Sequence, residues 1–312
     1  MTLSEWAGTI SGRKLSSRPG TEYAYSNVNY DLLGAIIEKA SGMSYRDYME
    51  KEILIPLGLE NTCVGMPSDT RIVEGTRLGY RQVFDFHIDV REARIPAGYF
   101  YSDAEDMARW TEIWIGAKSV PAELERALAK VRAGLNDEGD YYSGWERFAG
   151  DTIGHSGGTP NYSSRVMFSA GKNIGVCVLC NLNVAATTDS LCSSIFDIVS
   201  GNVPEGLSQD IWTVFDIVFT AVTVTGILIF IAVLRIAGRP LLITLGVILT
   251  VLFALVLILF PMIFGADMTE IMFTWAPWSL TGGLFITAAD IAVITIKLFS
   301  GRYHADNNKT SK

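Results

Sequence analysis

Three long apolar runs near the C-terminus restrict what this chain can fold into. Residues 217–234, 240–266 and 271–289 contain no charged side chain, and with Asp290 tolerated the third run extends to Ile296. A helix that spans a membrane needs about 20 predominantly apolar residues. Three such runs so close together leave too little polar surface to cover them as buried helices of a soluble core. The sequence therefore predicts three transmembrane helices.

The charges that flank these runs predict their direction across the bilayer. Arg235 and Arg239 lie in the first connection, whereas the second carries Asp267 and Glu270 and no basic residue. The tail has four basic residues: Lys297, Arg302, Lys309 and Lys312. Lys and Arg stay on the cytoplasmic side. A multi-pass protein is predicted, with an extracellular N-terminal domain and a cytoplasmic C-terminus.

Two tryptophans and two aspartates stand out in the apolar region. Trp275 and Trp278 are predicted at the outer interface, where indole rings are favoured. A carboxylate is costly inside a membrane, so Asp290 indicates a function, or else a group that is protonated or that faces another helix near the inner leaflet. Asp216, at the outer end of the first run, is interpreted as interfacial.

Composition divides the chain into regions. Residues 1–205 carry nearly all the charge and are predicted to form a globular domain, 206–300 the transmembrane region, and 301–312 a cytoplasmic tail. The formal net charge is −8, without a basic stripe, which argues against nucleic acid as a partner. The first ten residues do not resemble a signal peptide. A domain predicted outside without an export signal indicates that its N-terminal part is missing.

Helical patterns dominate the first half of the globular region. An apolar stripe at helical spacing predicts a helix that ends at Gly42, and its members are Leu32, Leu33, Ile36, Ile37 and Ala40. Further helices are predicted over 45–53, over 104–115 with Asp103 as N-cap, and over 122–133.

Strand patterns follow. Short β-prone runs with turns between them predict an antiparallel meander over 142–148, 152–155, 163–168 and 174–181. A helix over 189–199 is predicted to close on that sheet. The predicted class is α+β, an antiparallel sheet with flanking helices, followed by three transmembrane α-helices.

Four cysteines are present, and two of them form a C-x-x-C at Cys177 and Cys180. That pair lies in a predicted strand, where residues three apart point to opposite faces. Both thiols are interpreted as core residues. No second C-x-x-C or His pair completes a metal site, so neither a metal nor a cofactor is expected.

Two short motifs carry the functional signal. Tyr25-Ser26-Asn27 follows Pro19-Gly20, and His155-Ser156-Gly157-Gly158 lies well downstream. Between them, in order, come Ile55-Pro-Leu-Gly58 and Ala97-Gly98. In this order, residues from about 18 to 185 resemble the C-terminal two-thirds of the class C β-lactamase and D-Ala-D-Ala peptidase-like family. The resemblance implies a partial β-lactamase/transpeptidase-like fold.

The resemblance also implies roles for each motif residue. Tyr25 would relay a proton between nucleophile and leaving group, which requires neighbouring cations to lower the pKa of its phenol. Asn27 would bind the substrate amide. His155 would stand where the Lys-Thr-Gly version of the motif has Lys, with a charge that varies near neutral pH. Three more residues would bind substrate: Ser156 as a hydroxyl donor, and Gly157 and Gly158 through close backbone approach, with the Gly158 amide in an oxyanion hole.

The family's first motif, a nucleophilic Ser followed three residues later by Lys, has no room before Tyr25. Ser11-x-x-Lys14 and Ser169-x-x-Lys172 match it literally. Ser11 stands in a polar segment and Ser169 in a predicted hairpin turn, whereas the family needs this Ser at the start of a buried helix. The nucleophile and the first strands of the sheet are therefore predicted to be missing, which leaves a sticky sheet edge.

These observations predict a membrane-anchored β-lactamase-related serine hydrolase that is inactive as given. Its intact form would act on peptidoglycan-type peptides, small esters or β-lactams through an acyl-enzyme. The alternative is a non-catalytic envelope module that binds cell-wall peptides or signals across the bilayer. A third reading is a non-functional gene remnant.

Overall fold

A computed structural model describes residues 1–67, 72–135, 140–235 and 238–307. The chain divides into two compact units. The first comprises residues 1–75 and 87–208. The second comprises residues 76–86 and 209–312, so it joins a short segment from the middle of the globular region to the apolar helices.

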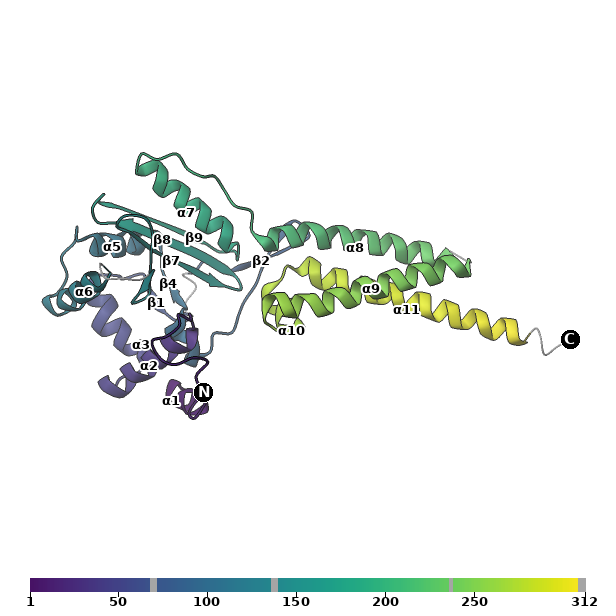
Figure 1. The fold of residues 1–312 in the computed structure, drawn as a ribbon, viewed down its shortest axis with the longest axis horizontal. Coiled ribbons are helices and arrows are strands. Elements are labelled where there is room, and N and C mark those ends of the chain that lie inside the picture. Colours follow the sequence, from purple (N-terminus) through teal and green to yellow (C-terminus); the bar gives the residue numbers. More distant parts are fainter. Residues whose placement is uncertain (68–71, 136–139, 236–237, 308–312) are drawn as a thin grey trace. The chain divides into compact units, whose positions relative to one another are not determined.

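A five-stranded antiparallel sheet organises the first unit (Figure 1). Its strands follow one another as a meander: β5 (Tyr141–Tyr142), β6 (Trp145–Arg147), β7 (Thr152–Thr159), β8 (Tyr162–Ser169) and β9 (Ile174–Cys180). Val166 and Phe168 of β8 pack on one face with Trp114 of helix α5 (Ala104–Ile115). Met167, between them, packs on the other face against α7 (Ala185–Val199), as strand alternation requires. The predicted meander and closing helix are confirmed.

The remaining elements of the first unit are short helices and one small sheet. The helices are α1 (Leu3–Thr9), α2 (Asn27–Ser41), α3 (Tyr45–Tyr48), the π-helix η1 (Met49–Leu54), α4 (Ile55–Leu57), the 3-10 helix η2 (Glu92–Ala97) and α6 (Ala122–Gly134). Strands β1 (Cys63–Val64) and β4 (Phe100–Tyr101) pair antiparallel.

Local sequence signals set several helix ends as predicted. Gly42 ends α2 in the left-handed conformation, and Asp103 caps α5 by accepting from the Asp106 amide. Helix α1, which the sequence analysis did not predict, begins with a capping box between Thr2 and Glu5.

One predicted strand was wrong. Residues 142–148 form not a single strand but a tight hairpin, β5 and β6, with Ser143 and Gly144 in the turn. Both turn residues have positive φ, which matches the twist of the flanking strands. The hairpin brings Tyr141 opposite Glu146.

In the described part of the second unit, three helices are long and apolar enough to cross a membrane. They are α8 (Ile211–Arg235), α9 (Arg239–Phe264) and α11 (Trp278–Asn307), and α11 packs along both of the others (Figure 1). Helix α10 (Met268–Glu270) and the π-helix η3 (Ile271–Trp275) precede α11. The predicted third run therefore starts with a separate turn, because Ala276 is extended and Pro277 has no N–H to continue a helix.

A β-hairpin docks on these helices. Strands β2 (Thr76–Gly79) and β3 (Gln82–Asp85) are joined by Tyr80 and Arg81, both with positive φ. The Arg81 amide donates to Asp216 Oδ2 (2.8 Å), and Ser279 Oγ donates to Asp216 Oδ1 (2.7 Å). Asp216, interpreted as interfacial from the sequence, is fully buried and holds the hairpin tip.

Candidate active site

The His155–Gly158 motif lies within β7, which pairs with β8 without interruption from Thr152 to Thr159. Beyond Gly154, β7 has no strand on its β6 side among the described residues. Gly158 is exposed, and a Cβ built on it would meet nothing within 4 Å. A Cβ on Gly157 would instead stand 2.4 Å from Ser164 Oγ. The backbone of β7 is therefore open to an approaching molecule at Gly158, whereas Ser164 occupies the space beside Gly157.

His155 belongs to a chain of hydrogen bonds. Its Nδ1 lies 2.6 Å from the Ser156 carbonyl oxygen, and its Nε2 lies 3.2 Å from the Tyr141 hydroxyl. A carbonyl can only accept, so Nδ1 carries a proton, and Nε2 shares its hydrogen bond with the Tyr141 hydroxyl. The Tyr141 hydroxyl is in turn hydrogen-bonded to that of Tyr30 on α2. The Ser156 carbonyl oxygen and the Tyr141 hydroxyl therefore hold the His155 ring in place, and Tyr30 holds Tyr141.

Tyr25 stands beside this chain. Its ring centroid lies 6.2 Å from that of His155, 5.8 Å from Tyr30 and 5.9 Å from Tyr141. Its side chain is 49% exposed, so the cluster is open to solvent. The fold thus brings together Tyr25 and His155, which are far apart in the sequence.

The electrostatics of the cluster favour protonated phenols. Burial, and then the neighbouring Tyr30, Tyr23 and Glu146, raise the pKa of Tyr25 above its ordinary value. Burial and the hydrogen bond with Tyr30 raise the pKa of Tyr141 as well. The expected lowering by cations is not among these causes. In these surroundings both hydroxyls are hydrogen-bond donors rather than bases.

Asn27 is the first residue of α2, and its side chain is exposed. The helix is capped by Ser26, whose hydroxyl accepts from the Val28 amide at 3.3 Å. The Asn27 side chain therefore does not cap the helix. Asn27 lies at the start of α2, two residues after Tyr25.

Ser156 faces away from this cluster, because adjacent residues of a strand point to opposite faces. Its hydroxyl donates to Asp189 Oδ1 on α7 (2.9 Å) and accepts from the Arg165 guanidinium. Arg165 is buried and also pairs with Glu146 Oε2 (3.1 Å). The structure thus places the Ser156 hydroxyl in a network between sheet and α7, away from His155.

Sequence reasoning missed Tyr30 and Tyr141. Tyr30 lies three positions after Asn27, on the same face of a helix, and this spacing could have found it. Tyr141 could not be placed while residues 142–148 were interpreted as one strand.

Neither literal Ser-x-x-Lys match begins a helix. Ser11 and Lys14 are exposed and follow α1. Ser169 is fully buried at the end of β8, where it donates to Asp151 Oδ1 (2.6 Å) and accepts from the Lys172 amide (3.1 Å). Those bonds form a hairpin turn, as the sequence predicts.

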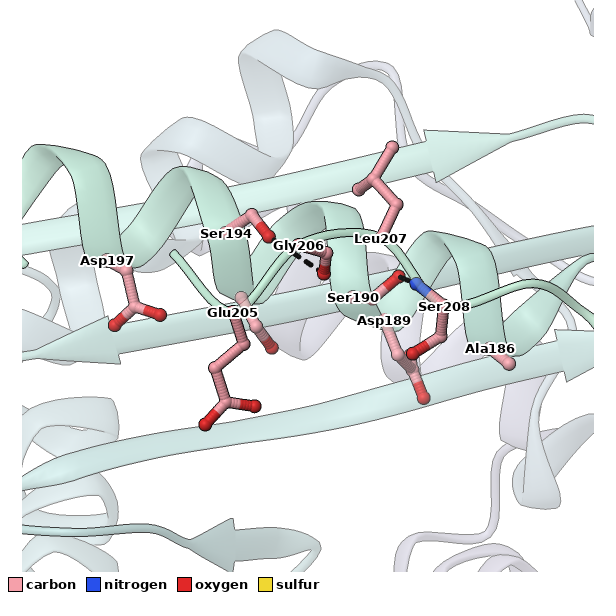
Figure 2. Close-up of a pocket in the computed structure, with 10 residues that line it drawn as sticks. Ala186, Asp189, Ser190, Ser194, Asp197, Glu205, Gly206, Leu207 and Ser208 are labelled. Atoms are coloured by element: carbon pink, nitrogen blue, oxygen red, sulfur yellow. Dashed lines mark hydrogen bonds between the residues drawn. The ribbon is translucent and has the colours of Figure 1, made fainter. Parts of the chain in front are cut away.

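A hollow of the first unit lies elsewhere, along α7 (Figure 2). Residues 205–208 run beside the helix. The Ser208 amide donates to Ser190 Oγ (2.9 Å), and Ser194 Oγ donates to the Gly206 carbonyl oxygen (3.3 Å). Asp189 lines this hollow and also accepts from Ser156. These contacts hold the segment that leaves α7, and they involve none of the tyrosines.

Cys177 and Cys180 lie in β9 and Cys192 in α7, whereas Cys63 lies in β1. Burial raises the pKa of Cys177, beside the α5 cluster, to about 11. Burial raises that of Cys192 on α7 to about 12. Among the described residues, no group of three or more His, Cys, Asp or Glu side chains gathers around a metal position.

The family model described as beta-lactamase matches residues 4–192, which is more than half of the chain. This chain belongs to the β-lactamase family. It is 29% identical over 192 residues to protein flp of Staphylococcus aureus (strain N315), covering 58% of this chain and 38% of that protein. A penicillin-binding protein of Bacillus subtilis (strain 168) is 30% identical over 171 residues, covering 48% of this chain and 37% of the relative. The chain thus spans under two-fifths of the length of these curated relatives.

Solved structures show the same fold. The β-lactamase from Sulfitobacter sp. EE-36 aligns with a TM-score of 0.55 at 21% identity, covering 64% of this chain and 66% of that one. The octameric penicillin-binding protein homologue from Pyrococcus abyssi aligns with a TM-score of 0.54 at 23% identity, covering 66% and 49%. The first unit is accordingly called the β-lactamase-like unit, and the second the helical unit.

Proposed function

We propose that the β-lactamase-like unit contributes part of an acyl-transfer site in a membrane-associated serine hydrolase. The contact between Tyr25 and His155 carries the proposal, because two motifs of the family meet there with ring centroids 6.2 Å apart. The substrates proposed are D-amino-acyl peptides of the cell wall, small esters or β-lactams.

The residues take the following parts. Tyr25 passes a proton between the nucleophile and the leaving group, and Asn27 binds the substrate amide. His155, held by Tyr141, orients the substrate or the Tyr25 hydroxyl. The exposed Gly158 offers its amide to the oxyanion, because its open side lets a substrate approach the backbone. Gly157 keeps β7 flat against β8, and Ser156 supports β7 from the opposite face.

The proton step sets a condition on the active form. A phenol acts as a base only when a neighbouring cation stabilises its charged form, and burial raises the pKa of Tyr25 instead. The proposed base therefore needs a cation beside Tyr25, as a Ser-x-x-Lys motif supplies. Because neither Ser11 nor Ser169 begins a helix, residues 1–312 alone are proposed to form no acyl-enzyme.

A fluorescent penicillin tests this directly. The chain of 312 residues, purified in detergent and incubated with the reagent, is expected to show no covalent label after denaturation. Ser11→Ala and Ser169→Ala serve as matched variants. A covalent label that one of them abolishes would identify a nucleophile and overturn the proposed inactivity.

A second candidate function is reversible peptide binding without chemistry. The Tyr25 hydroxyl stays protonated and half-exposed, so it presents a donor to a peptide carboxylate or carbonyl. Equilibrium dialysis with a D-Ala-D-Ala peptide is expected to show one site per chain. Tyr25→Phe and His155→Ala should weaken binding. Tyr142→Phe is the control and should not weaken it, because the Tyr142 ring contacts α6. Absence of saturable binding would exclude this candidate.

The proposed topology places the β-lactamase-like unit outside and the C-terminus in the cytoplasm. It rests on the basic residues of the first connection and the tail. In a background where all four native cysteines are replaced by Ser, a membrane-impermeant maleimide should label Asn202→Cys on intact cells and Ser311→Cys only after permeabilisation. The reverse pattern would invert the proposed orientation.

A further inference from the structure

Helices α8 and α11 enclose a carboxyl group that has no partner. Asp290 lies in α11 and is completely buried, and neither of its carboxyl oxygens has a hydrogen-bond partner. The facing residue on α8 is Gly226, where a Cβ would stand 3.5 Å from Asp290 Oδ2 and 2.7 Å from Ile286 Cγ2. The missing side chain of Gly226 therefore lets the α8 backbone cover Asp290 closely.

The charged side chains of the surrounding helices lie at the ends of the bundle. On α8 they are Asp216 and Arg235, on α9 Arg239, and on α11, as far as its side chains are described, Lys297 besides Asp290 itself. Asp216 accepts two hydrogen bonds. The Lys297 ammonium donates to the carbonyl oxygens of Val233 and Leu234, about 10 Å further along the helix axis than Asp290. No cation pairs with the Asp290 carboxyl among the described residues.

These surroundings determine the chemical form of the group. An ionised carboxylate without donors or counter-ions in a medium of low dielectric constant costs far more than a neutral acid, so the group takes up a proton instead. We propose that Asp290 is a proton-binding site within the helical unit, a neutral carboxylic acid as long as α8 and α11 remain packed. Its ligand is a proton exchanged with water when the helix pair opens.

Infrared difference spectroscopy tests this on the full chain in lipid vesicles at neutral pH. The wild type is expected to show the carbonyl-stretching band of a protonated carboxylic acid, shifted in heavy water. Asp290→Asn should abolish that component, because an amide has no carboxylic-acid band. The variant should still fold, because the amide keeps the shape of the acid. Asp216→Asn is the matched control, because Asp216 is equally buried but has donors, and it should leave the component unchanged. Loss of a carboxylate band in Asp290→Asn would overturn the proposal.

A second measurement needs no substitution. Hydrophobic dicyclohexylcarbodiimide adds to a protonated carboxyl group, whose O–H proton moves to a carbodiimide nitrogen as the carboxyl oxygen bonds to its carbon. The isourea then rearranges to a stable N-acylurea. Peptide mass spectrometry should find this adduct on Asp290 and not on Asp216. A wild-type protein with neither the acid band nor the adduct would contradict the proposal even if both variants failed to fold.

Discussion

Arg77 in the helical unit and His155 in the β-lactamase-like unit both lie on antiparallel strands, but their surroundings differ. Arg77 is 2% exposed, and its guanidinium donates to the carbonyl oxygens of Met272, Phe273 and Ala276. It also lies 4.0 Å from the ring centroid of Trp278. His155 is partly exposed beside an open tyrosine cluster. Arg77 is buried among its hydrogen-bond partners, whereas the surroundings of His155 are open to solvent and leave a surface for another molecule.

The difference reflects what each site must satisfy. The last carbonyl groups of a helix have no partner within it, and those around η3 lie in a buried setting. Arg77 supplies the missing donors, as a basic side chain does at a helix C-terminus. Burial lowers the pKa of Arg77 to about 10, so it remains charged at neutral pH. Polar groups at the hairpin thus stabilise the fold, whereas those around Tyr25 can be changed at little cost to stability.

The largest effect is expected from Arg77→Met. The substitution keeps most of the apolar stem but leaves three buried carbonyl groups without donors, so stability should fall by about 3–5 kcal/mol. Urea unfolding in detergent micelles, followed through circular dichroism, measures the change.

Arg81→Gln is the control for this prediction. Arg81 contacts Asp216 through its backbone amide only, and its side chain is exposed. Stability should therefore change by less than about 0.5 kcal/mol. Equal losses in the two variants would mean that the Arg77 guanidinium has no special role.

The β2–β3 hairpin was not predictable from the sequence. No defined strand was predicted over residues 76–85, because Tyr80-Arg81 lacks the Gly or Asn typical of such turns. Its docking depends on carbonyl groups almost 200 positions away, which no local pattern indicates. The three apolar runs and the helix α2 were predictable because apolar residues continue over, or recur along, the length of a helix. In α2 the buried residues are nevertheless Asp31 and Gly34, whereas Leu33 and Ile36 of the predicted stripe are exposed.

The candidate site also has parts that the sequence indicates and parts that depend on the fold. Tyr25, Asn27 and His155 were proposed as site residues because their motifs occur in family order, and the fold places Tyr25 beside His155. The orientation of Ser156 depends on its position within β7 and on Asp189 of α7. A motif specifies which residues gather, whereas strand register decides which face each side chain takes.

A smaller loss, about 1 kcal/mol, is expected from Ser156→Ala. The substitution removes a donor to Asp189 and an acceptor for Arg165, but both partners keep access to water or to Glu146. Thermal unfolding of the purified chain measures it, with Ser164→Ala as a control on the neighbouring strand. If Ser156→Ala left stability unchanged but abolished peptide binding, Ser156 would belong to the binding surface after all.

The smallest effect on stability is expected from Tyr25→Phe, within about 0.5 kcal/mol at neutral pH.

The pH dependence of the stability difference between wild type and Tyr25→Phe is more informative. Because the pKa of Tyr25 in the folded state is raised above 10.0, the folded state holds this proton more tightly than the unfolded chain does. The stability that follows is complete below pH 10 and is lost as the pH rises through the folded-state value. Difference spectra between wild type and Tyr25→Phe should accordingly show the Tyr25 phenolate only above the pH at which free tyrosine ionises. A phenolate signal near neutral pH would mean that a cation lies beside Tyr25, and the cluster would then already hold a base.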